Sequence, residues 1–119
     1  MRSLGIAILL ALTVVICAAC ATWHAQQGRN RANLMNLQIG MSQFQVLTAM
    51  GPPDLNEAYL RPGGGTLVAL FYYTNRTWAD GNVTRDECTP VVLQDGKVIG
   101  WGQDFLRSTL NLEVRIKQE

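Results

Sequence analysis

The pattern of apolar and polar positions predicts two short helices before any strand. The clearest segment is 37–54, which reads LQIGMSQFQVLTAMGPPD. Ser42 and Gln45 have the spacing of a capping box, in which each side chain bonds a free backbone N–H at a helix start. The glycine and two prolines that follow residue 50 end such a helix. We therefore predict a helix over about 42–50, after a shorter one over about 31–38.

Extended segments follow these helices. Residues 66–74 (TLVALFYYT) are apolar on both faces of a strand, and such a strand is normally covered on both faces. The dipeptide Asp95-Gly96 separates two apolar runs, 88–94 and 97–102, and Asp-Gly in this setting favours a two-residue hairpin turn. Residues 55–60 are compatible with a further short edge strand, which the pattern leaves open.

The order of the elements indicates the fold class. Asp104 can cap a final short helix with apolar residues at helical spacing. Helices followed by a run of strands are typical of an α+β domain. We predict two N-terminal helices packed on a three-stranded antiparallel meander, with a short C-terminal helix. The domain would comprise residues 34–112, with 113–119 as a tail.

The N-terminal stretch differs in kind from the rest. A basic residue precedes an apolar run over 4–16, and Cys17-Ala18-Ala19-Cys20 follows. This arrangement predicts a secretory signal over residues 1–19. The alternative is an uncleaved anchor, because residues 4–22 are 19 residues without a charge, close to the ~20 that a spanning helix needs. The polar residues 20–33 then predict a tether.

Ala18-Ala19-Cys20 resembles the end of a bacterial lipobox, in which the cysteine becomes the acylated first residue. Cys17 stands where leucine is usual, and Cys17-Ala18-Ala19 also fits ordinary cleavage. The resemblance implies lipidation at Cys20 and attachment to a membrane through acyl chains. Ala21 follows, and in similar lipoproteins a residue other than aspartate there favours export to the outer membrane, facing the periplasm. A retained anchor would instead place the chain at the inner membrane.

Charge and cysteine content narrow the function classes. Of the ten basic residues Arg2 is lost with the signal, so nine basic residues face nine acidic ones and the net charge is zero. A nucleic-acid-binding domain needs a basic surface, so we expect no nucleic acid partner. The one histidine, His24, lies in the tether. With Cys20 acylated, Cys88 is the only thiol left for the domain, and we expect no catalytic set, cofactor or metal.

One loop and one thiol carry the candidate chemistry. The polar loop 75–87 is long for a small domain, and long loops are often functional. Its oxygen-rich part does not fit an EF-hand, because Arg85 stands where the sixth-position glycine is needed. Cys88 has no neighbouring base and opens an apolar strand, as a small buried hydrophobe does. A thiol- or metal-dependent enzyme using Cys88 and the loop 80–87 remains the alternative. The candidate interaction surface is Trp78, Asp80, Asp86 and Glu87.

Several blocks of sequence resemble known families. Gly40-Met41-Ser42 and Met50-Gly51-Pro52-Pro53-Asp54, followed by an Asp-Gly hairpin, resemble the SmpA/BamE group of small outer-membrane lipoproteins. Phe71-Tyr72-Tyr73, Asp86-Glu87-Cys88-Thr89-Pro90 and Gly100-Trp101-Gly102 are similar to a proteobacterial lipoprotein family of unknown function. The resemblance implies a BamE-like fold and a protein-binding role.

We therefore expect a membrane-anchored periplasmic lipoprotein that acts as a protein-interaction module. Its partner would be an envelope protein, in outer-membrane or envelope assembly or maintenance. An inhibitor-like binder of a soluble enzyme is a further alternative, because some similar folds inhibit enzymes.

Overall fold

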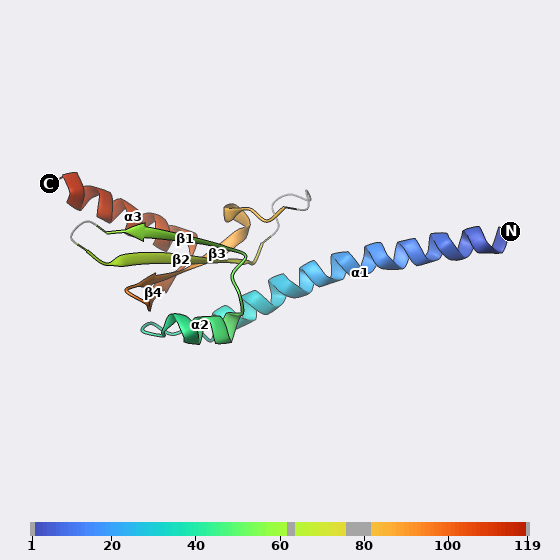
Figure 1. Cartoon of the computed structure of the whole chain (residues 1–119), viewed down its shortest axis with the longest axis horizontal. Helices are drawn as coiled ribbons and strands as arrows, with labels where there is room; N and C mark the ends of the chain where they lie inside the picture. The colour runs from blue at the N-terminus through green and yellow to red at the C-terminus, as the bar shows by residue number, and fades with distance from the viewer. Residues whose placement is uncertain (1, 62–63, 76–81, 119) are drawn as a thin grey trace.

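The computed structural model describes residues 2–61, 64–75 and 82–118 (Figure 1). The elements in chain order are α1 (Arg2–Leu34), α2 (Gln43–Met50), β1 (Leu55–Leu60), β2 (Thr66–Tyr73), the 3₁₀-helix η1 (Arg85–Glu87), β3 (Cys88–Gln94), β4 (Lys97–Trp101) and α3 (Gln103–Gln118). The strands form one antiparallel sheet in the order β1-β2-β3-β4. The predicted α+β class is confirmed, with four strands rather than three, because the segment left open at 55–60 pairs with β2 along its whole length.

The capping box forms as the sequence predicts. Ser42 Oγ accepts a hydrogen bond from the backbone N–H of Gln45 at 3.2 Å, and the backbone N–H of Ser42 donates to Gln45 Oε1 at 2.8 Å. At the other end of α2, Gly51 has a φ of +79° and its N–H donates to Leu47 O at 2.8 Å. Both ends of α2 are therefore fixed by local sequence.

The first helix differs from the prediction. Residues 20–33, expected to form a tether, continue α1, which ends at Leu34 instead of beginning near residue 31. Gln27 and Asn30 are each only 7% exposed, because this part of α1 lies against the domain. A pattern search for apolar residues cannot detect a helix that docks through amides. At the other end of the chain, residues 113–118, expected to be a tail, continue α3.

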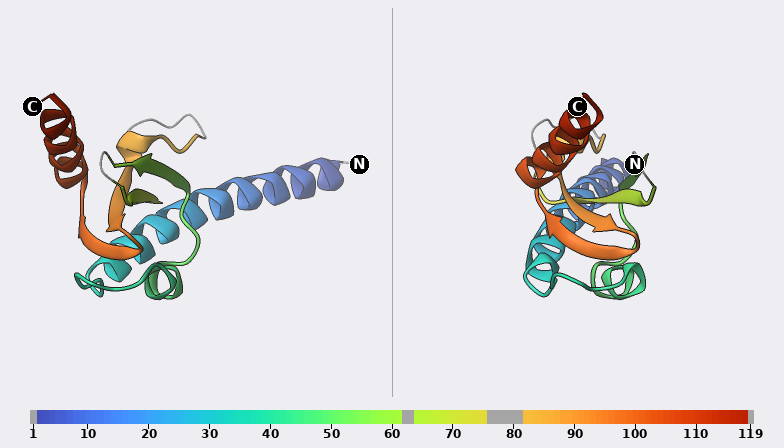
Figure 2. Two further views of the ribbon diagram at one scale, coloured as in Figure 1. Left: turned by 60° about the vertical axis from the view of Figure 1, so that its left-hand side comes forward. Right: turned by 90° about the vertical axis from the view of Figure 1, so that its left-hand side faces the viewer.

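The sheet lies between two helical layers (Figure 2). One core cluster joins β2, β3 and β4 to α2 and to the segment after α1; its buried members are Leu37, Val46, Met50, Leu70, Tyr72, Val91, Leu93 and Val98. A second lies on the opposite face, where α3 packs, and its buried members are Leu67, Ala69, Phe71, Tyr73, Cys88, Val92 and Leu106. The two apolar faces predicted for β2 are therefore both covered.

The N-terminal part of α1 projects away from the domain (Figure 1), and the molecule measures 76 Å along its longest axis. The large apolar side chains of residues 4–16 are 55–71% exposed, on every side of the helix. Within the described part of the chain, no helix is long and apolar enough to cross a membrane.

The corner between β4 and α3 depends on a glycine. A Cβ added at Gly100 would lie 2.5 Å from Cζ of Phe105, whose ring packs directly on the strand. Neighbouring Gly102 has a φ of +106° and turns the chain into α3. Gly100 is thus required by side-chain packing and Gly102 by backbone conformation.

We expect Gly100→Ala to lower the free energy of unfolding by about 1–3 kcal/mol, because the new methyl group overpacks the Phe105 ring. The measurement is urea unfolding of the detergent-solubilised chain. Gly28→Ala is the matched control: it is helical with nothing within 4 Å of an added Cβ, so it should raise stability by roughly 0.5–1 kcal/mol. Equal effects of the two substitutions would contradict the packing argument.

Candidate functional site

A single carboxylate joins α1 to the end of β2. Asp54 Oδ1 accepts a hydrogen bond from Gln26 Nε2 at 2.9 Å, and Oδ2 accepts one from the backbone N–H of Tyr73 at 2.9 Å. One turn further along α1, Asn30 Nδ2 donates to the carbonyl of Tyr73 at 2.7 Å in a buried position. We call this set of contacts, made by Gln26, Asn30, Asp54 and Tyr73, the Asp54 bridge. It fixes α1 on the sheet at the end where β2 finishes.

Local sequence places Asp54 at this point. Pro52 and Pro53 follow the C-terminal glycine of α2 and prevent the helix from continuing. The N–H of Asp54 then donates to Phe71 O at 2.9 Å, so the residue enters the sheet immediately before β1. Sequence reasoning identified the motif as a helix stop but missed the role of the carboxylate, whose partners lie 28 and 19 residues away.

Cys88 lies beside the bridge, opposite Tyr73 in the β2–β3 register. Its side chain is 3% exposed. Burial raises the pKa of the thiol from its ordinary value to about 12, and the negative charges of Asp54 and Glu87 contribute further. The thiol is therefore protonated at neutral pH, whereas a nucleophilic cysteine must be a thiolate. This geometry suits a buried structural residue.

The predicted surface residues have different positions. Trp78 and Asp80 lie outside the described residues, and Asp86 is exposed on η1. Glu87, expected at the surface, is 1% exposed. Its backbone carbonyl accepts hydrogen bonds from the N–H groups of Thr74 and Asn75, both at 3.0 Å. Glu87 therefore holds η1 against the end of β2, and its carboxylate is not presented to a partner.

Arg85 crosses the face of the sheet beside η1. Its guanidinium carbon lies 5.2 Å from the centroid of the Phe71 ring, a cation–π geometry. Its Nη2 atom lies 3.2 Å from Glu57 Oε2 on β1. The hydroxyl of Tyr59 also donates to Glu57. The one charged side chain of β1 is thus neutralised by Arg85.

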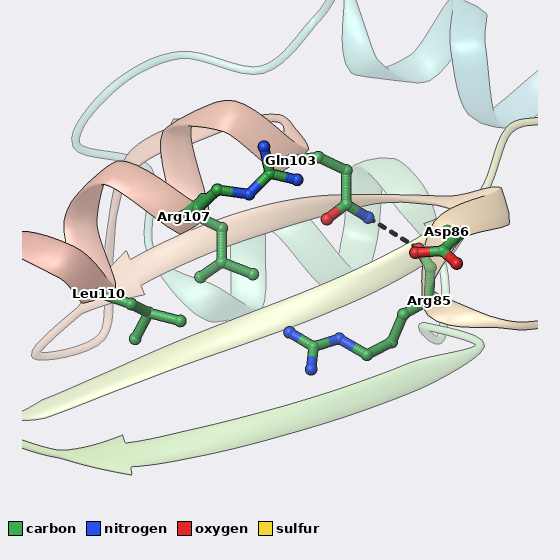
Figure 3. Close-up of a pocket in the computed structure, with 6 residues that line it drawn as sticks. Arg85, Asp86, Gln103, Arg107 and Leu110 are labelled. Atoms are coloured by element: carbon green, nitrogen blue, oxygen red, sulfur yellow. Dashed lines mark hydrogen bonds between the residues drawn. The ribbon is translucent and has the colours of Figure 1, made fainter.

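A groove of about 270 Å³ lies between η1 and α3. Figure 3 shows side chains that line it. Gln103 spans its inner end, with Nε2 donating to the carbonyls of Arg85 at 2.7 Å and Cys88 at 2.9 Å. The residues that line the groove are Arg85, Asp86, Gln103, Leu106, Arg107 and Leu110. Nothing in the sequence pattern marked Gln103, because its partners are backbone atoms brought together by the sheet.

The arrangement offers contacts that can bind another molecule. Across residues 2–61, 64–75 and 82–118, no three His, Cys, Asp or Glu side chains converge to hold a metal. The carboxylate of Asp54 accepts from Gln26 and Tyr73, and that of Glu57 pairs with Arg85. Glu87 Oε1 accepts from Thr84 Oγ1 at 3.2 Å, while Glu87 Oε2 is buried with no hydrogen-bond partner among the described residues. Asp86 is exposed. Chemically, this part of the surface offers hydrogen-bond donors, paired charges and apolar edges to another macromolecule.

Comparison with known proteins identifies the family. The family model described as "Protein of unknown function (DUF3192)" matches residues 11–108, and the chain belongs to this family. A search of curated proteins found no match. A search of solved structures also found none.

We expect Asp54→Asn to lower the free energy of unfolding by about 2 kcal/mol, since an amide accepts through only one atom and meets the second donor with its own NH₂ group. Urea unfolding measures this change. Asp104→Asn is the control, because the Asp104 side chain is 99% exposed and its substitution should stay within about 0.5 kcal/mol. Similar values for both variants would show that the bridge contributes nothing to stability.

The raised pKa of Cys88 predicts a loss of stability at alkaline pH. The unfolded thiol ionises near its ordinary pKa of 9.0 and the folded one near 12. Stability is therefore fully present below pH 9 and falls as the pH rises towards 12, by about 2–3 kcal/mol at pH 11. Unfolding of the wild type and Cys88→Ala, compared at pH 8 and pH 11, measures this difference.

The ionisation of Tyr72 does not affect the difference in stability between the wild type and Cys88→Ala. Burial and the charge of Asp54 raise its pKa to about 12 as well, but Tyr72 is present in both variants and its contribution cancels. Parallel pH profiles for the wild type and Cys88→Ala would contradict a buried, protonated thiol.

Proposed function

We propose that this member of the DUF3192 family is an envelope lipoprotein: a protein-interaction module held at the outer membrane by acyl chains on Cys20 and facing the periplasm. The observation that carries the proposal is the segment 4–16 of α1, which is apolar on every side and 55–71% exposed. Water is a poor environment for such a surface. Its length suits the apolar part of a cleaved signal, and lipid would cover it before cleavage.

The remaining part of α1 would act as a rigid stalk. Cys20 precedes Gln26 by six residues of continuous helix, which at the helical rise is about 9 Å. The Asp54 bridge fixes the helix just beyond that point. An acyl anchor at Cys20 would therefore hold the domain close to the membrane in one orientation. The end of the sheet where β2 finishes would face the membrane, and the turn between β3 and β4 would point away from it (Figure 1).

Binding to a protein is favoured over catalysis. Cys88 is buried and protonated, which removes the thiolate that the enzyme alternative needs. Between the end of α1 and the first turn of α2, Met35, Ile39 and Phe44 are 87%, 68% and 78% exposed. Exposed apolar side chains gathered in one short segment commonly mark a contact site for another protein. Confinement to a membrane raises the effective concentration of such a partner, so weak contacts suffice.

The finer likeness to the SmpA/BamE group is part of the same proposal. Its support is the packing of α2 and the end of α1 on one face of β2, β3 and β4. Strand β1 extends that pattern beyond the three strands expected from the sequence. A role in assembly or maintenance of the envelope follows from this likeness, with an envelope protein as partner.

Mass spectrometry of the mature N-terminus tests the proposal. We expect an acylated cysteine, Cys20, as the first residue in membrane fractions. Cys20→Ala should abolish acylation and release the chain from the outer-membrane fraction. Cys17→Leu is the matched control: it places the usual residue of a lipobox at that position, so acylation should be kept. A chain that still begins at residue 1, or one that begins at residue 20 without lipid, would refute the proposed anchor.

The inhibitor-like alternative predicts a different result in the same strains. A binder of a soluble periplasmic enzyme needs no anchor, so Cys20→Ala would then leave the cellular phenotype unchanged. Loss of the phenotype together with loss of acylation supports the anchored module.

A further inference from the structure

The outer edge of β1 is an unpaired strand edge in a sheet whose other edge is closed. At β4, residues 40–43 lie alongside the strand: Gly40 N–H donates to Val98 O at 2.8 Å, and Val98 N–H donates to Met41 O at 2.9 Å. Along β1 the pairing is to β2 alone among the described residues. We propose that this edge of β1 is a strand-addition site that takes an extended segment of another envelope protein. The choice of occupant rests on the proposed membrane anchor.

The hydrogen-bond register shows which groups are available. Arg61 N–H donates to Gly65 O at 3.2 Å, and these two residues continue the β1–β2 register. Hydrogen-bonded and non-hydrogen-bonded pairs alternate in an antiparallel ladder, so the odd-numbered residues of β1 bond to β2. The even-numbered residues therefore direct their N–H and C=O groups outward, and these are Asn56, Ala58 and Leu60.

This edge lacks the usual protection against pairing. Edge strands are commonly blocked by proline, lysine, a bulge or an inward-pointing charge. Strand β1 (LNEAYL) contains no proline or lysine, and its pairing with β2 is regular throughout. Its one charge, on Glu57, is neutralised by Arg85 at 3.2 Å. A charge neutralised in this way does not repel an incoming strand.

The helices that the structure describes pack mainly on the other strands. Helix α3 contacts β3 and β4, and α1 contacts β2, so the main helical contacts lie away from β1. Asn56 and Ala58 are exposed, and Leu60 is 88% exposed. The incoming segment would place alternate side chains beside these three, which are uncharged, so uncharged residues at alternate positions fit best.

A second copy of this chain joined antiparallel at β1 does not suit the site once the chain is anchored. Joining two β1 strands antiparallel places a two-fold axis perpendicular to the sheet and reverses the strand direction of one copy. Helix α1 leaves the domain roughly along the strands (Figure 1). The two helices would therefore leave from opposite ends of the dimer, and only one could reach a given membrane. A segment from a different protein has no such restriction.

Photo-crosslinking in the native membrane tests the site. The full chain carries p-benzoylphenylalanine at position 56, 58 or 60 in turn, with position 104 on α3 as the matched exposed control. We expect all three edge positions to crosslink to one segment of one other protein. The crosslinked residues in that segment should step by two as the probe moves from 56 to 58 to 60, since strands pair in register.

Each other pattern overturns the proposal: adducts to lipid alone, adducts to a second copy of the chain, adducts to a protein without the two-residue step, or no adduct above the level of position 104. The mature N-terminus is measured on the same samples. An unacylated chain that still gives the stepped crosslinks refutes the anchor, whereas an acylated chain without them refutes only the strand site.

A binding measurement completes the test. The crosslinked segment is made as a synthetic peptide and titrated into the solubilised chain. Ala58→Pro removes an outward N–H while leaving the β1–β2 ladder its own bonds, so we expect the affinity to fall at least tenfold. Ala58→Val keeps the N–H and should bind like the wild type. Equal binding by both variants overturns the proposal, and the crosslinks decide it if Ala58→Pro does not fold.

Discussion

The hydrogen bonds of the Asp54 carboxylate determine how the N-terminal helix is placed on the sheet. One oxygen accepts from α1 through Gln26 and the other from β2 through Tyr73 N, each at 2.9 Å. Hydrophobic contacts are non-directional, whereas hydrogen bonds to a charged acceptor fix an angle as well as a distance. Among the described side chains of α1, the fully buried ones are Gln27 and Asn30, and the apolar Leu34 at its end is half-buried against the core. Its direction therefore depends on polar contacts, and so does the direction in which the membrane would lie.

The sheet needs helices on both faces because β2 is apolar on both faces. Phe71 and Tyr73 lie in the cluster beside α3, and Leu70 and Tyr72 lie in the cluster beside α2, each of the four at most 2% exposed. A small domain buries a limited fraction of its surface. Dividing the core into two thin clusters therefore leaves only a small buried apolar surface in each. This explains why a corner such as Gly100, where Phe105 packs directly on the strand, tolerates no added atom. Burial in these clusters also raises the pKa values of Cys88 and Tyr72, at the bridge end of the sheet, and favours their neutral forms.

Local signals in the sequence predicted local structure well, but they could not predict polar contacts between residues far apart in the chain. The capping box of Ser42 and Gln45 and the Asp95-Gly96 turn involve neighbours in the chain, and both form as predicted. Strand β1 was left open because an exposed edge strand has only a weak alternation of apolar residues. Residues 20–33, predicted as a tether, are instead the docked part of α1. A hydrophobic pattern cannot reveal this docking, because Gln26 and Asn30 make their contacts through amide groups. Of the candidate site, Asp86 is exposed as expected, but Glu87 is turned inward by η1. The role of Asp54 required knowing that residues 26, 54 and 73 meet in space.

The proposed stalk and the open edge of β1 constrain each other. Because α1 leaves the domain roughly along the strands (Figure 1), a strand added to β1 would run roughly along the line from the anchor to the turn between β3 and β4. A chain that rises from the same membrane surface already has this direction near the domain. A segment lying flat on the membrane would have to turn before it could pair, and ordering that turn costs conformational entropy. Rigid attachment through the Asp54 bridge would thus select partners by direction as well as by sequence, which a flexible tether could not do.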